Sequence, residues 1–253
     1  MLRCNKDPIV INFVDSGTLR KKFEDNNKRL DEIKQKLEDY LTTKRAAFPR
    51  FFFLTNDELI QILSQTRNAQ AVQPFLNKCF DSIKRIKFTE EKNSKEILAM
   101  TSPEGEVVDF YESCFAHGPV ENWLNNIEQA MFVSLYMITR NGMEIYPEDG
   151  RHRNEWLFHC AAQCILVVDQ IKWTAGVEGA IFEIMGGKNR SALQEFNAFS
   201  QEQLTSMINL VGGPLGKQER NMMGALIVLD VHGRTVVDRL IKTRVDNIND
   251  FDW

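Results

Sequence analysis

The sequence predicts a mainly α-helical fold, an elongated multi-helix bundle with one small β-hairpin at about residues 97–110. Glycine (14) and proline (7) are sparse among the 253 residues, which disfavours the many turns of an all-β fold. Over most of the chain, apolar residues recur at the spacing of helices that bury one face. Apolar and charged residues make up 43% and 26% of the chain. These values are typical of globular proteins, so disorder is excluded.

Composition also excludes several classes of function. The formal net charge of −4 provides no overall attraction to nucleic acid. The most apolar stretches, 156–168 and 222–229, are too short to span a bilayer. We therefore expect neither nucleic acid nor a membrane as a partner. The five cysteines are an odd number and fit neither a disulfide framework nor two CxxC zinc pairs, so reduced thiols in a cytosolic protein are expected.

The first region, predicted to span 18–95, follows an N-terminal segment, 1–17, of uncertain structure. It begins with a long polar helix over about 18–45. When this helix is written as heptads, one seam position falls on Phe23, Leu30 and Leu37, and the other on Leu19, Asn26, Ile33 and Tyr40. So narrow an apolar stripe fits two interpretations. Either the helix packs on its own domain, or it contacts a partner helix as in a coiled-coil adaptor.

An aromatic run follows the long helix. Pro49 disfavours helical backbone at Phe48, so the helix must end before that residue. Three consecutive phenylalanines, 51–53, predict a short extended segment that carries rings on both faces and is buried on both sides. Thr55 and Glu58 then predict a capping box, in which each side chain accepts a hydrogen bond from the other residue's amide. Further helical residues are expected at 59–63 and 75–83.

The second region, predicted to span 96–253, contains the hairpin and a helical bundle. The strands 97–101 and 106–110 flank the turn Ser102-Pro103-Glu104-Gly105, in which glycine supplies the left-handed residue of a type I turn with a bulge. Helices are expected at about 119–138, 154–173, 175–185, 191–211 and 217–243, with a turn-rich stretch at 141–154. The 154–173 helix is apolar nearly all round and should be central in the core.

One loop is superficially similar to a phosphate-binding loop. The run 212–218, Gly-Gly-Pro-Leu-Gly-Lys-Gln, has valine at 211 where the first glycine of the motif is needed. Gln218 stands where the motif needs the serine or threonine that holds Mg²⁺. An interhelical turn is therefore expected, and no nucleotide site.

Other reactive residues suggest no catalytic site. His159, Cys160 and Cys164 share one predicted helix, which leaves a thiol or metal enzyme as an alternative, but no second pair completes a zinc site and structural packing is favoured. His232 and Asp230, two residues apart on a helix, do not face each other. His152 sits in a basic turn. The basic run 84–87, near Phe80 and Phe88, predicts a solvated helix face. We predict no catalytic, cofactor-binding or metal-binding residue.

The segment 44–65, Lys-Arg-Ala-Ala-Phe-Pro-Arg-Phe-Phe-Phe-Leu-Thr-Asn-Asp-Glu-Leu-Ile-Gln-Ile-Leu-Ser-Gln, resembles the linker region of dynein heavy chains, especially axonemal ones. Its signature residues are Phe48, Pro49, Arg50, Phe51, Phe53, Asn56, Asp57 and Glu58. Further similar runs follow in the family's order at 71–74, 78–84, 100–106, 120–124, 170–174 and 229–241. The chain departs from the family at Gly212-Gly213, where an arginine–glycine pair is usual, and at Gly233, where alanine is usual. The resemblance covers about residues 18–253.

The resemblance implies a linker-type helical bundle, the C-terminal part of the linker that precedes the first AAA+ module. It implies a force-transmitting element of an ATP-driven, microtubule-based motor that is not catalytic by itself. The ATP and Mg²⁺ sites of the parent ATPase would lie outside these residues. A helical scaffold or coiled-coil adaptor that uses the 18–45 seam is the alternative.

The implied partners are the AAA+ ring of the same heavy chain, microtubules through distant parts, and intermediate and light chains through the tail. The implied location is cytoplasmic and cytoskeletal, in the axoneme of a cilium or flagellum. Pro103, Glu104 and Gly105 at the hairpin tip are the candidate contact with the ring, and a solvent-facing turn is the alternative for them.

Overall fold

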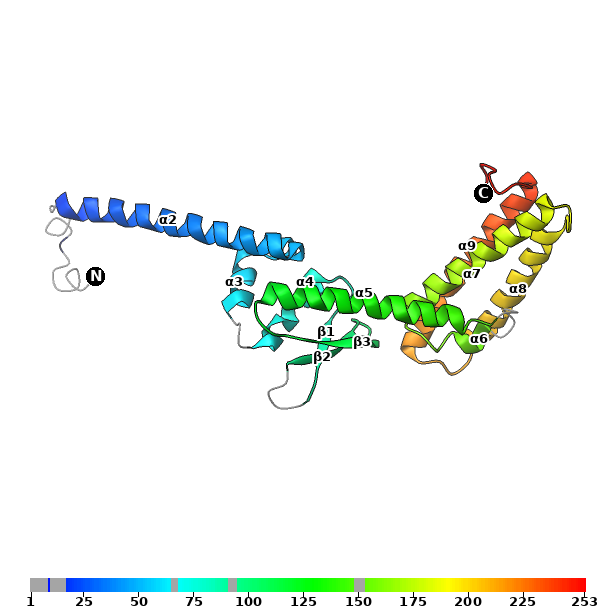
Figure 1. Ribbon diagram of the computed structural model, residues 1–253, viewed down its shortest axis with the longest axis horizontal. Coiled ribbons are helices and arrows are strands. Elements are labelled where there is room, and N and C mark those ends of the chain that lie inside the picture. The colour runs from blue at the N-terminus through cyan, green and yellow to red at the C-terminus, as the bar shows by residue number, and fades with distance from the viewer. Residues whose placement is uncertain (1–8, 10–16, 65–67, 91–94, 148–152) are drawn as a thin grey trace. The chain divides into compact units, whose positions relative to one another are not determined.

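The computed structural model describes residues 9, 17–64, 68–90, 95–147 and 153–253, and the helices and the small sheet are shown in Figure 1. The predicted mainly α-helical class is confirmed. The chain forms two compact units, one of residues 1–81 and 116–125 and the other of 82–115 and 126–253. None of the helices in the described part is long and apolar enough to cross a membrane.

The first unit begins with the long helix α2 (Gly17–Ala47) and continues with η1 (Pro49–Phe53), α3 (Asn56–Ser64), η2 (Ala69–Phe75) and α4 (Leu76–Cys79). The predicted long helix is confirmed, and it ends before Phe48, whose backbone is extended (φ −136°, ψ 95°). Large buried side chains from these elements form the core: Leu41, Phe48, Phe51, Leu59, Ile62 and Leu76.

The prediction of an extended, doubly buried phenylalanine run is wrong. Residues 49–53 form a 3₁₀-helix, because Pro49 presets a helical φ at its first position. With three residues per turn, Phe48 and Phe51 fall on one side, and both are 0% exposed. Phe52 and Phe53 face outward and are 67% and 68% exposed. The helical period, rather than the strand period, therefore decides which rings are buried.

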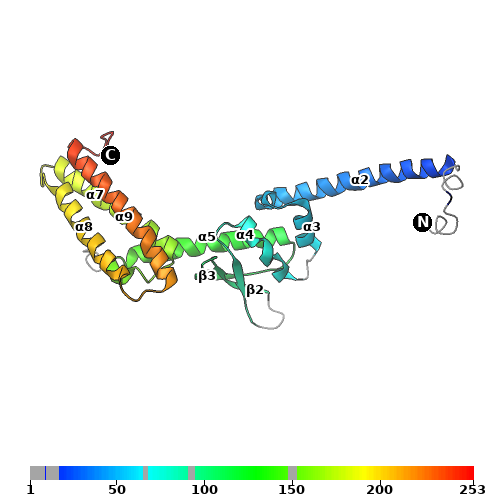
Figure 2. The same cartoon turned by 180° about the vertical axis from the view of Figure 1, so that it is seen from behind.

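The apolar stripe of α2 does not pack on its own unit. Its described residues are exposed by 42–61%, namely Phe23, Leu30, Ile33, Leu37 and Tyr40. Only the C-terminal end of α2 is held, where Leu41 is 1% exposed and α3 and η1 lie against the helix. Figures 1 and 2 show no other described element of this unit beside the N-terminal half. The interpretation that this stripe packs on the helix's own domain is wrong for these residues.

The sheet of the second unit has three antiparallel strands in the order β1 (Arg85–Phe88), β2 (Glu96–Thr101), β3 (Val107–Phe115). The predicted hairpin is β2–β3, with Thr101 paired to Val107. Gly105 has a φ of 95°, as the predicted turn requires. The expected helix face at 84–87 is wrong: this run enters β1, where Arg85 and Lys87 are exposed and Ile86 is buried. That alternation is the two-residue period of a strand.

The described residues of the second unit also form five helices: α5 (Val120–Glu144), whose first residues belong to the first unit, α6 (Arg153–Trp156), α7 (Ala162–Met185), α8 (Ala192–Val211) and α9 (Lys217–Thr243). The predictions of α8 and α9 are confirmed within a residue. The expected helix 154–173 is wrong at its start, because a turn separates α6 from α7. The expected break before 175 is also wrong, because Gly176 lies inside α7. A Cβ at Gly176 would come within 2.4 Å of the Phe196 ring, so glycine here allows α8 to approach.

Helices α7, α8 and α9 lie side by side in both ribbon views (Figures 1 and 2) and are in mutual contact. One cluster of buried side chains includes Trp156, Leu157, Ile165, Val168, Leu204, Met207, Met222, Met223 and Leu226. A second cluster includes Val177, Ile181, Leu193, Val237 and Leu240. Helix α7 contributes to both clusters, so its predicted central position is confirmed.

Candidate functional site: a buried ion triad and the hairpin contact

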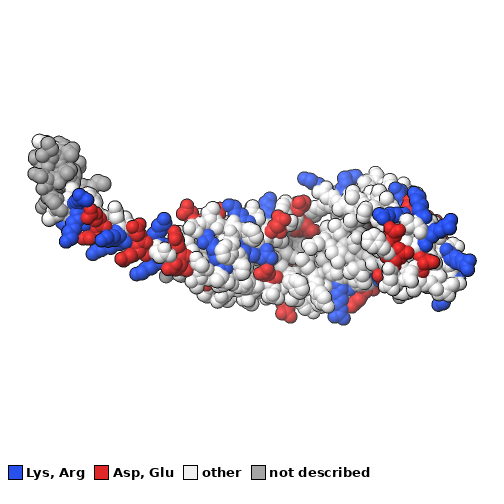
Figure 3. Space-filling model, turned by 90° about the horizontal axis from the view of Figure 1, so that it is seen from above, with Lys and Arg blue, Asp and Glu red and all other residues white. Residues whose placement is uncertain are grey.

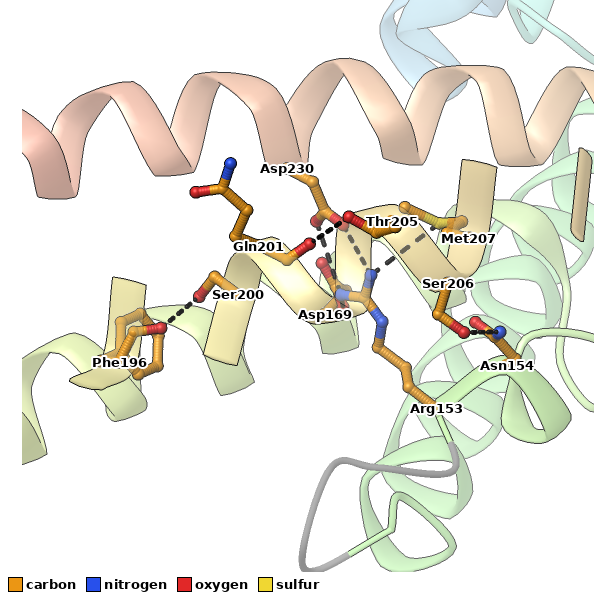
Figure 4. A network of polar contacts seen from close by, with 10 residues as sticks. All are labelled: Arg153, Asn154, Asp169, Phe196, Ser200, Gln201, Thr205, Ser206, Met207 and Asp230. Carbon is orange, nitrogen blue, oxygen red and sulfur yellow. Dashed lines mark hydrogen bonds and ion pairs between the residues drawn. The ribbon is translucent and has the colours of Figure 1, made fainter. Parts of the chain in front are cut away.

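A single guanidinium ties three helices of the second unit together (Figure 4). Arg153 of α6 is 4% exposed. Its Nη1 donates to Asp169 Oδ1 of α7 at 2.8 Å, and its Nη2 donates to Asp230 Oδ2 of α9 at 2.6 Å. Met207 of α8 places its sulfur 3.8 Å from the same Nη2. The guanidinium of α6 therefore binds carboxylates of α7 and α9, and it also contacts α8 through the Met207 sulfur.

With both carboxyls ionised, the triad contains one more negative than positive charge in a buried place, because the side chains of Arg153, Asp169 and Asp230 are only 5%, 3% and 11% exposed. Burial, together with the negative charge of Asp230, raises the pKa of Asp169 to about 6, against the lowering effect of Arg153. Burial opposes the charge on Arg153, but Asp169 and Asp230 outweigh it and raise the arginine pKa above its ordinary value. Both carboxylates are engaged by Arg153, so neither is placed as a free general base.

A cavity of about 230 Å³ lies beside the triad. Aromatic side chains contribute to its lining, among them Tyr146, Trp173, Phe196 and Phe199. Burial raises the pKa of Tyr146 to about 12, so this phenol stays protonated near neutral pH. A Cβ placed on Gly233 would lie 2.8 Å from Trp173 Nε1, so glycine at this position leaves room for the indole.

The hairpin turn is pinned to the starts of two helices. Glu106 Oε1 accepts a hydrogen bond from the Ala162 amide at 2.8 Å, and α7 has no cap from its own Ala161. A carboxylate there also complements the positive end of the α7 dipole. Gln218 of α9 donates from Nε2 to the carbonyl oxygen of Glu104 at 3.1 Å. The sheet is thus fixed to the bundle through its turn.

The candidate contact residues lie at this same turn. The side chains of Pro103 and Glu104 are exposed, as is Gly105, while the Glu104 carbonyl is occupied by Gln218. Contact of this tip with a ring stays a prediction. The sequence of the turn, with proline at 103 and glycine at 105, predicted the type of turn correctly. It contained nothing that indicated the hydrogen bond to Gln218, more than a hundred residues later.

Part of the family signature forms an aromatic corner in the first unit. Phe48 and Phe51 meet edge to face at 4.9 Å between ring centroids, and Phe80 lies 6.1 Å from Phe48. The Arg50 guanidinium lies 4.8 Å from the Phe80 ring centroid and donates from Nη1 to the Cys79 carbonyl at 3.0 Å. This corner joins the turn after α2 to α4. Phe53 lies outside it, exposed to solvent.

Polar signature residues fix the start of α3. The predicted capping box is confirmed: the Thr55 amide donates to Glu58 Oε2 at 3.0 Å, and the Glu58 amide donates to Thr55 Oγ1 at 3.3 Å. Asn56 Oδ1 accepts from Arg45 of α2 at 2.9 Å, and Asp57 lies in the first turn of α3. Lys78 pairs with Glu58 and lowers the pKa of that carboxyl. The signature is therefore a corner that sets how α3 leaves α2.

The thiol and histidine candidates are not brought together. His159 and Cys160 lie in the turn before α7, and only Cys164 is helical, so their expected shared helix is wrong. Among the described residues no group of three histidine, cysteine or acidic residues could hold a metal ion. Burial raises the pKa of both Cys160 and Cys164, which disfavours their reactive thiolates. His232 is exposed, while Asp230, two residues before it, forms an ion pair with Arg153.

The 212–216 loop joins α8 to α9 as the predicted interhelical turn. Gln218 stands where a phosphate-binding loop needs a hydroxyl, and its side chain donates to the hairpin instead. The absence of a nucleotide site stays a prediction. His152, with its neighbour Arg151, and Cys4 lie outside the described residues. Sequence reasoning missed the triad, although Asp169 offered one signal: a lone carboxylate within the apolar stretch 162–171.

Comparison with known proteins supplies the family. The family model described as "Dynein heavy chain, N-terminal region 2" matches residues 1–142. Dynein axonemal heavy chain 6 of Homo sapiens is 39% identical over 271 aligned residues, which cover all of this chain and 6% of the relative. Dynein axonemal heavy chain 3 of Mus musculus is 38% identical over 256 residues, with the same coverage of both chains.

A third relative, dynein axonemal heavy chain 1 of Homo sapiens, is 39% identical over 246 residues, which cover 96% of this chain and 6% of the relative. The chain thus spans about 6% of the length of these relatives. Because the family model matches more than half of its residues, and the matched segment contains the aromatic corner and the hairpin, the chain belongs to the dynein heavy chain family.

Proposed function

We propose that this chain is a force-transmitting linker segment of a microtubule-based dynein motor and does no catalysis itself. The observation that carries the proposal is the Arg153 triad, which anchors α6, α7 and α9 at one buried point. An element that transmits force needs internal stiffness. Helices joined through a buried ion cluster resist relative sliding, because sliding would leave a buried charge without its partner. The pinned hairpin turn adds a second attachment between sheet and bundle.

The proposal places the ATP and Mg²⁺ sites in other parts of the heavy chain, in its AAA+ ring. The ring is then the partner of this segment, and microtubules and the smaller dynein chains are reached through distant parts. The axoneme of a cilium or flagellum is the proposed location, in keeping with the names of the relatives.

We further propose the hairpin tip as the contact with the ring. The exposed side chains of Pro103 and Glu104 support this, since the turn's attachment to α9 uses only a backbone carbonyl. In a full-length heavy chain, Pro103→Ala and Glu104→Ala are expected to slow microtubule gliding. Glu112→Ala, an exposed residue on β3 away from the turn, is the control. Unchanged gliding in both tip variants would contradict the contact.

The non-catalytic part of the proposal is tested on the isolated chain. Labelled ATP with Mg²⁺ is titrated against the protein and binding is followed by fluorescence anisotropy. The expected result is no saturable binding, because the one loop similar to a phosphate cradle lacks its hydroxyl and its first glycine. Saturable binding in the micromolar range would contradict it.

A further inference from the structure

The strongest feature outside the site described above is the apolar stripe of α2. Its seam residues are exposed over five turns of helix, and the three most exposed, Leu30, Ile33 and Phe23, are 61%, 61% and 57% accessible. Asn26 is the one polar residue within this row. Large apolar side chains along one face of a helix are costly to leave in water and mark a contact surface. The heptad spacing indicates that another helix fits this surface, because side chains at this spacing pack into the gaps between side chains of a facing helix.

The charges beside the stripe are of one sign. In the heptad defined by Phe23, Leu30 and Leu37, the two positions that flank the seam carry only basic residues among their charged members: Lys22, Arg29 and Lys36 on one side, Arg20 and Lys34 on the other. The acidic residues lie on the outer positions of the helix: Glu24, Asp25, Asp31, Glu32, Glu38 and Asp39. Figure 3 shows these two signs along α2.

The flanking basic residues are exposed and mostly unused. Arg20 pairs with Glu24 one turn away on the surface of α2. Within the part of the chain that the structure describes, Lys22, Arg29, Lys34 and Lys36 make no ion pair. Flanking charges of this kind select the partner of a helix by pairing across the seam.

The same face already meets an acidic residue where it is covered. Lys44, one turn beyond Tyr40 on the stripe, pairs with Glu121 at the start of α5 at 2.5 Å. Glu121 is 6% exposed, and this contact raises the pKa of Lys44. Asn125 of α5 also donates to the Ala47 carbonyl, at 3.1 Å. At the covered end of the stripe, a neighbouring helix therefore brings one carboxylate to a basic residue of the seam itself.

A second copy of this chain does not supply that chemistry. Two α2 helices packed seam to seam would oppose basic flanks to basic flanks in either direction, and like charges across a helix pair are unfavourable. We therefore propose that α2 between residues 19 and 40 is a docking surface for an amphipathic helix of a protein partner whose apolar seam is flanked by glutamate or aspartate. This inference concerns a surface and does not depend on the proposed function.

The test uses two synthetic helical peptides as probes. Both carry the same leucine and isoleucine seam, with glutamate at every flanking position in one peptide and lysine in the other. Binding to the whole chain is measured by fluorescence anisotropy at low and at physiological salt. The acidic peptide is expected to bind at least about tenfold more tightly, with a preference that shrinks as salt rises, because several exposed ion pairs replace like-charge contacts.

Matched variants locate the effect on α2. Arg29→Glu combined with Lys36→Glu reverses two flanking charges and is expected to abolish or invert the preference. Lys21→Glu combined with Lys28→Glu makes the same change in net charge on the opposite side of the helix and should leave the preference intact. Circular dichroism shows that each variant keeps its helices, which the exposure of all four residues favours.

Three results would overturn the proposal. The first is absence of binding by either peptide, which would mean that the stripe is not open to an acidic-flanked helix. The second is equal affinity for the two peptides, or a preference that survives in the flanking-charge variant. The third is a dimer of the unmodified chain, detected by sedimentation velocity, that dissociates when Leu30 or Ile33 is replaced by glutamate, which would make a second copy the occupant.

Discussion

At the scale of single residues, Arg153 determines how the helices of the second unit meet. A buried ion pair is weak grounds for net stability, because desolvation of the charges offsets their attraction. Its geometry is nevertheless specific: two hydrogen bonds from one guanidinium fix the relative positions of α6, α7 and α9. The helices cannot slide without leaving a buried charge without its partner.

Removal of the guanidinium should therefore be severe. Arg153→Met would keep much of the volume but leave Asp169 and Asp230 facing each other, and the free energy of unfolding is expected to fall by about 3–5 kcal/mol. Arg140→Met is the matched control, because Arg140 pairs with Glu144 on the exposed surface of α5, and a change within about 0.5 kcal/mol is expected there. Urea titration measures both, and similar losses in the two variants would contradict the role of the triad.

The raised pKa of Asp169 gives the triad a pH dependence. The folded value of about 6 exceeds the ordinary value of 3.8, so the folded state binds the proton more tightly than the unfolded state. The stability tied to this proton is complete below the ordinary value and is lost as pH rises through about 6. Between pH 5 and pH 7 the wild type should lose about 1 kcal/mol relative to Asp169→Asn, which does not titrate. A constant difference between the two proteins across this range would show that Asp169 does not titrate between pH 5 and pH 7 and would contradict this assignment.

Single residues also separate what the sequence could predict from what it could not. The capping box at Thr55 and Glu58 was predictable because both partners lie within one turn. The triad was not, because Arg153 and Asp230 are 77 residues apart and meet only through the packing of three helices. Phe52 and Phe53 were assigned to a core because the strand period was applied to a turn that has the helical one.

At the scale of elements, the hairpin is held by its turn rather than by its strands alone. The Glu106 side chain caps α7 from outside the helix. Glu104 contributes only its backbone carbonyl, which accepts from Gln218, so its side chain takes no part in holding the turn to α9. Glu106→Ala is expected to lower the free energy of unfolding by about 1 kcal/mol, the usual cost of a lost N-terminal cap. Glu104→Ala and Pro103→Ala should change it by no more than about 0.5–1 kcal/mol. Thermal melting ranks the three, and a Glu106 effect no larger than that of Glu104 would contradict the capping role.

Helix α2 is held at its C-terminal end and carries its stripe in the open. Gln35 lies on the side of the helix away from the stripe, so Gln35→Pro breaks the helix without touching the seam. The loss of one backbone hydrogen bond and the clash with the preceding turn cost about 3 kcal/mol locally. We expect circular dichroism to show less helix. The melting temperature of the aromatic corner should stay unchanged, because the corner lies on the C-terminal side of the break. Gln35→Ala should retain full helix content, and cooperative unfolding of the whole unit by the proline would contradict this description.

Element boundaries followed local signals where these were strong. Gly212 and Gly213 after α8 and the proline turn of the hairpin are such signals, and the elements beside them were predicted closely. Strand β1 was missed because a four-residue strand has too few residues to display its period, and its pairing with β2 is a tertiary fact. The start of α7 was missed because the apolar run continues through the turn at 157–161 into the helix.

At the scale of the whole molecule, the chain consists of two compact units that interleave in sequence, since residues 116–125 belong to the first unit and 82–115 to the second. Helix α5 passes from one to the other without a break. A division of this kind depends on long-range contacts and cannot be read from hydrophobic period or turn residues. Family membership was recognisable from the sequence because the aromatic corner is encoded in one continuous run, 44–65.

We propose that this segment transmits force while ATP chemistry takes place elsewhere in the heavy chain. The most direct test measures ATPase rate and microtubule gliding on the same preparation of a full-length heavy chain carrying Gln35→Pro, with Gln35→Ala as control. Hydrolysis should be largely retained and gliding strongly slowed in the proline variant, while the alanine variant behaves as wild type in both. A folded proline variant that glides at the wild-type speed would contradict force transmission through α2, and loss of hydrolysis would contradict the separation of this segment from the chemistry.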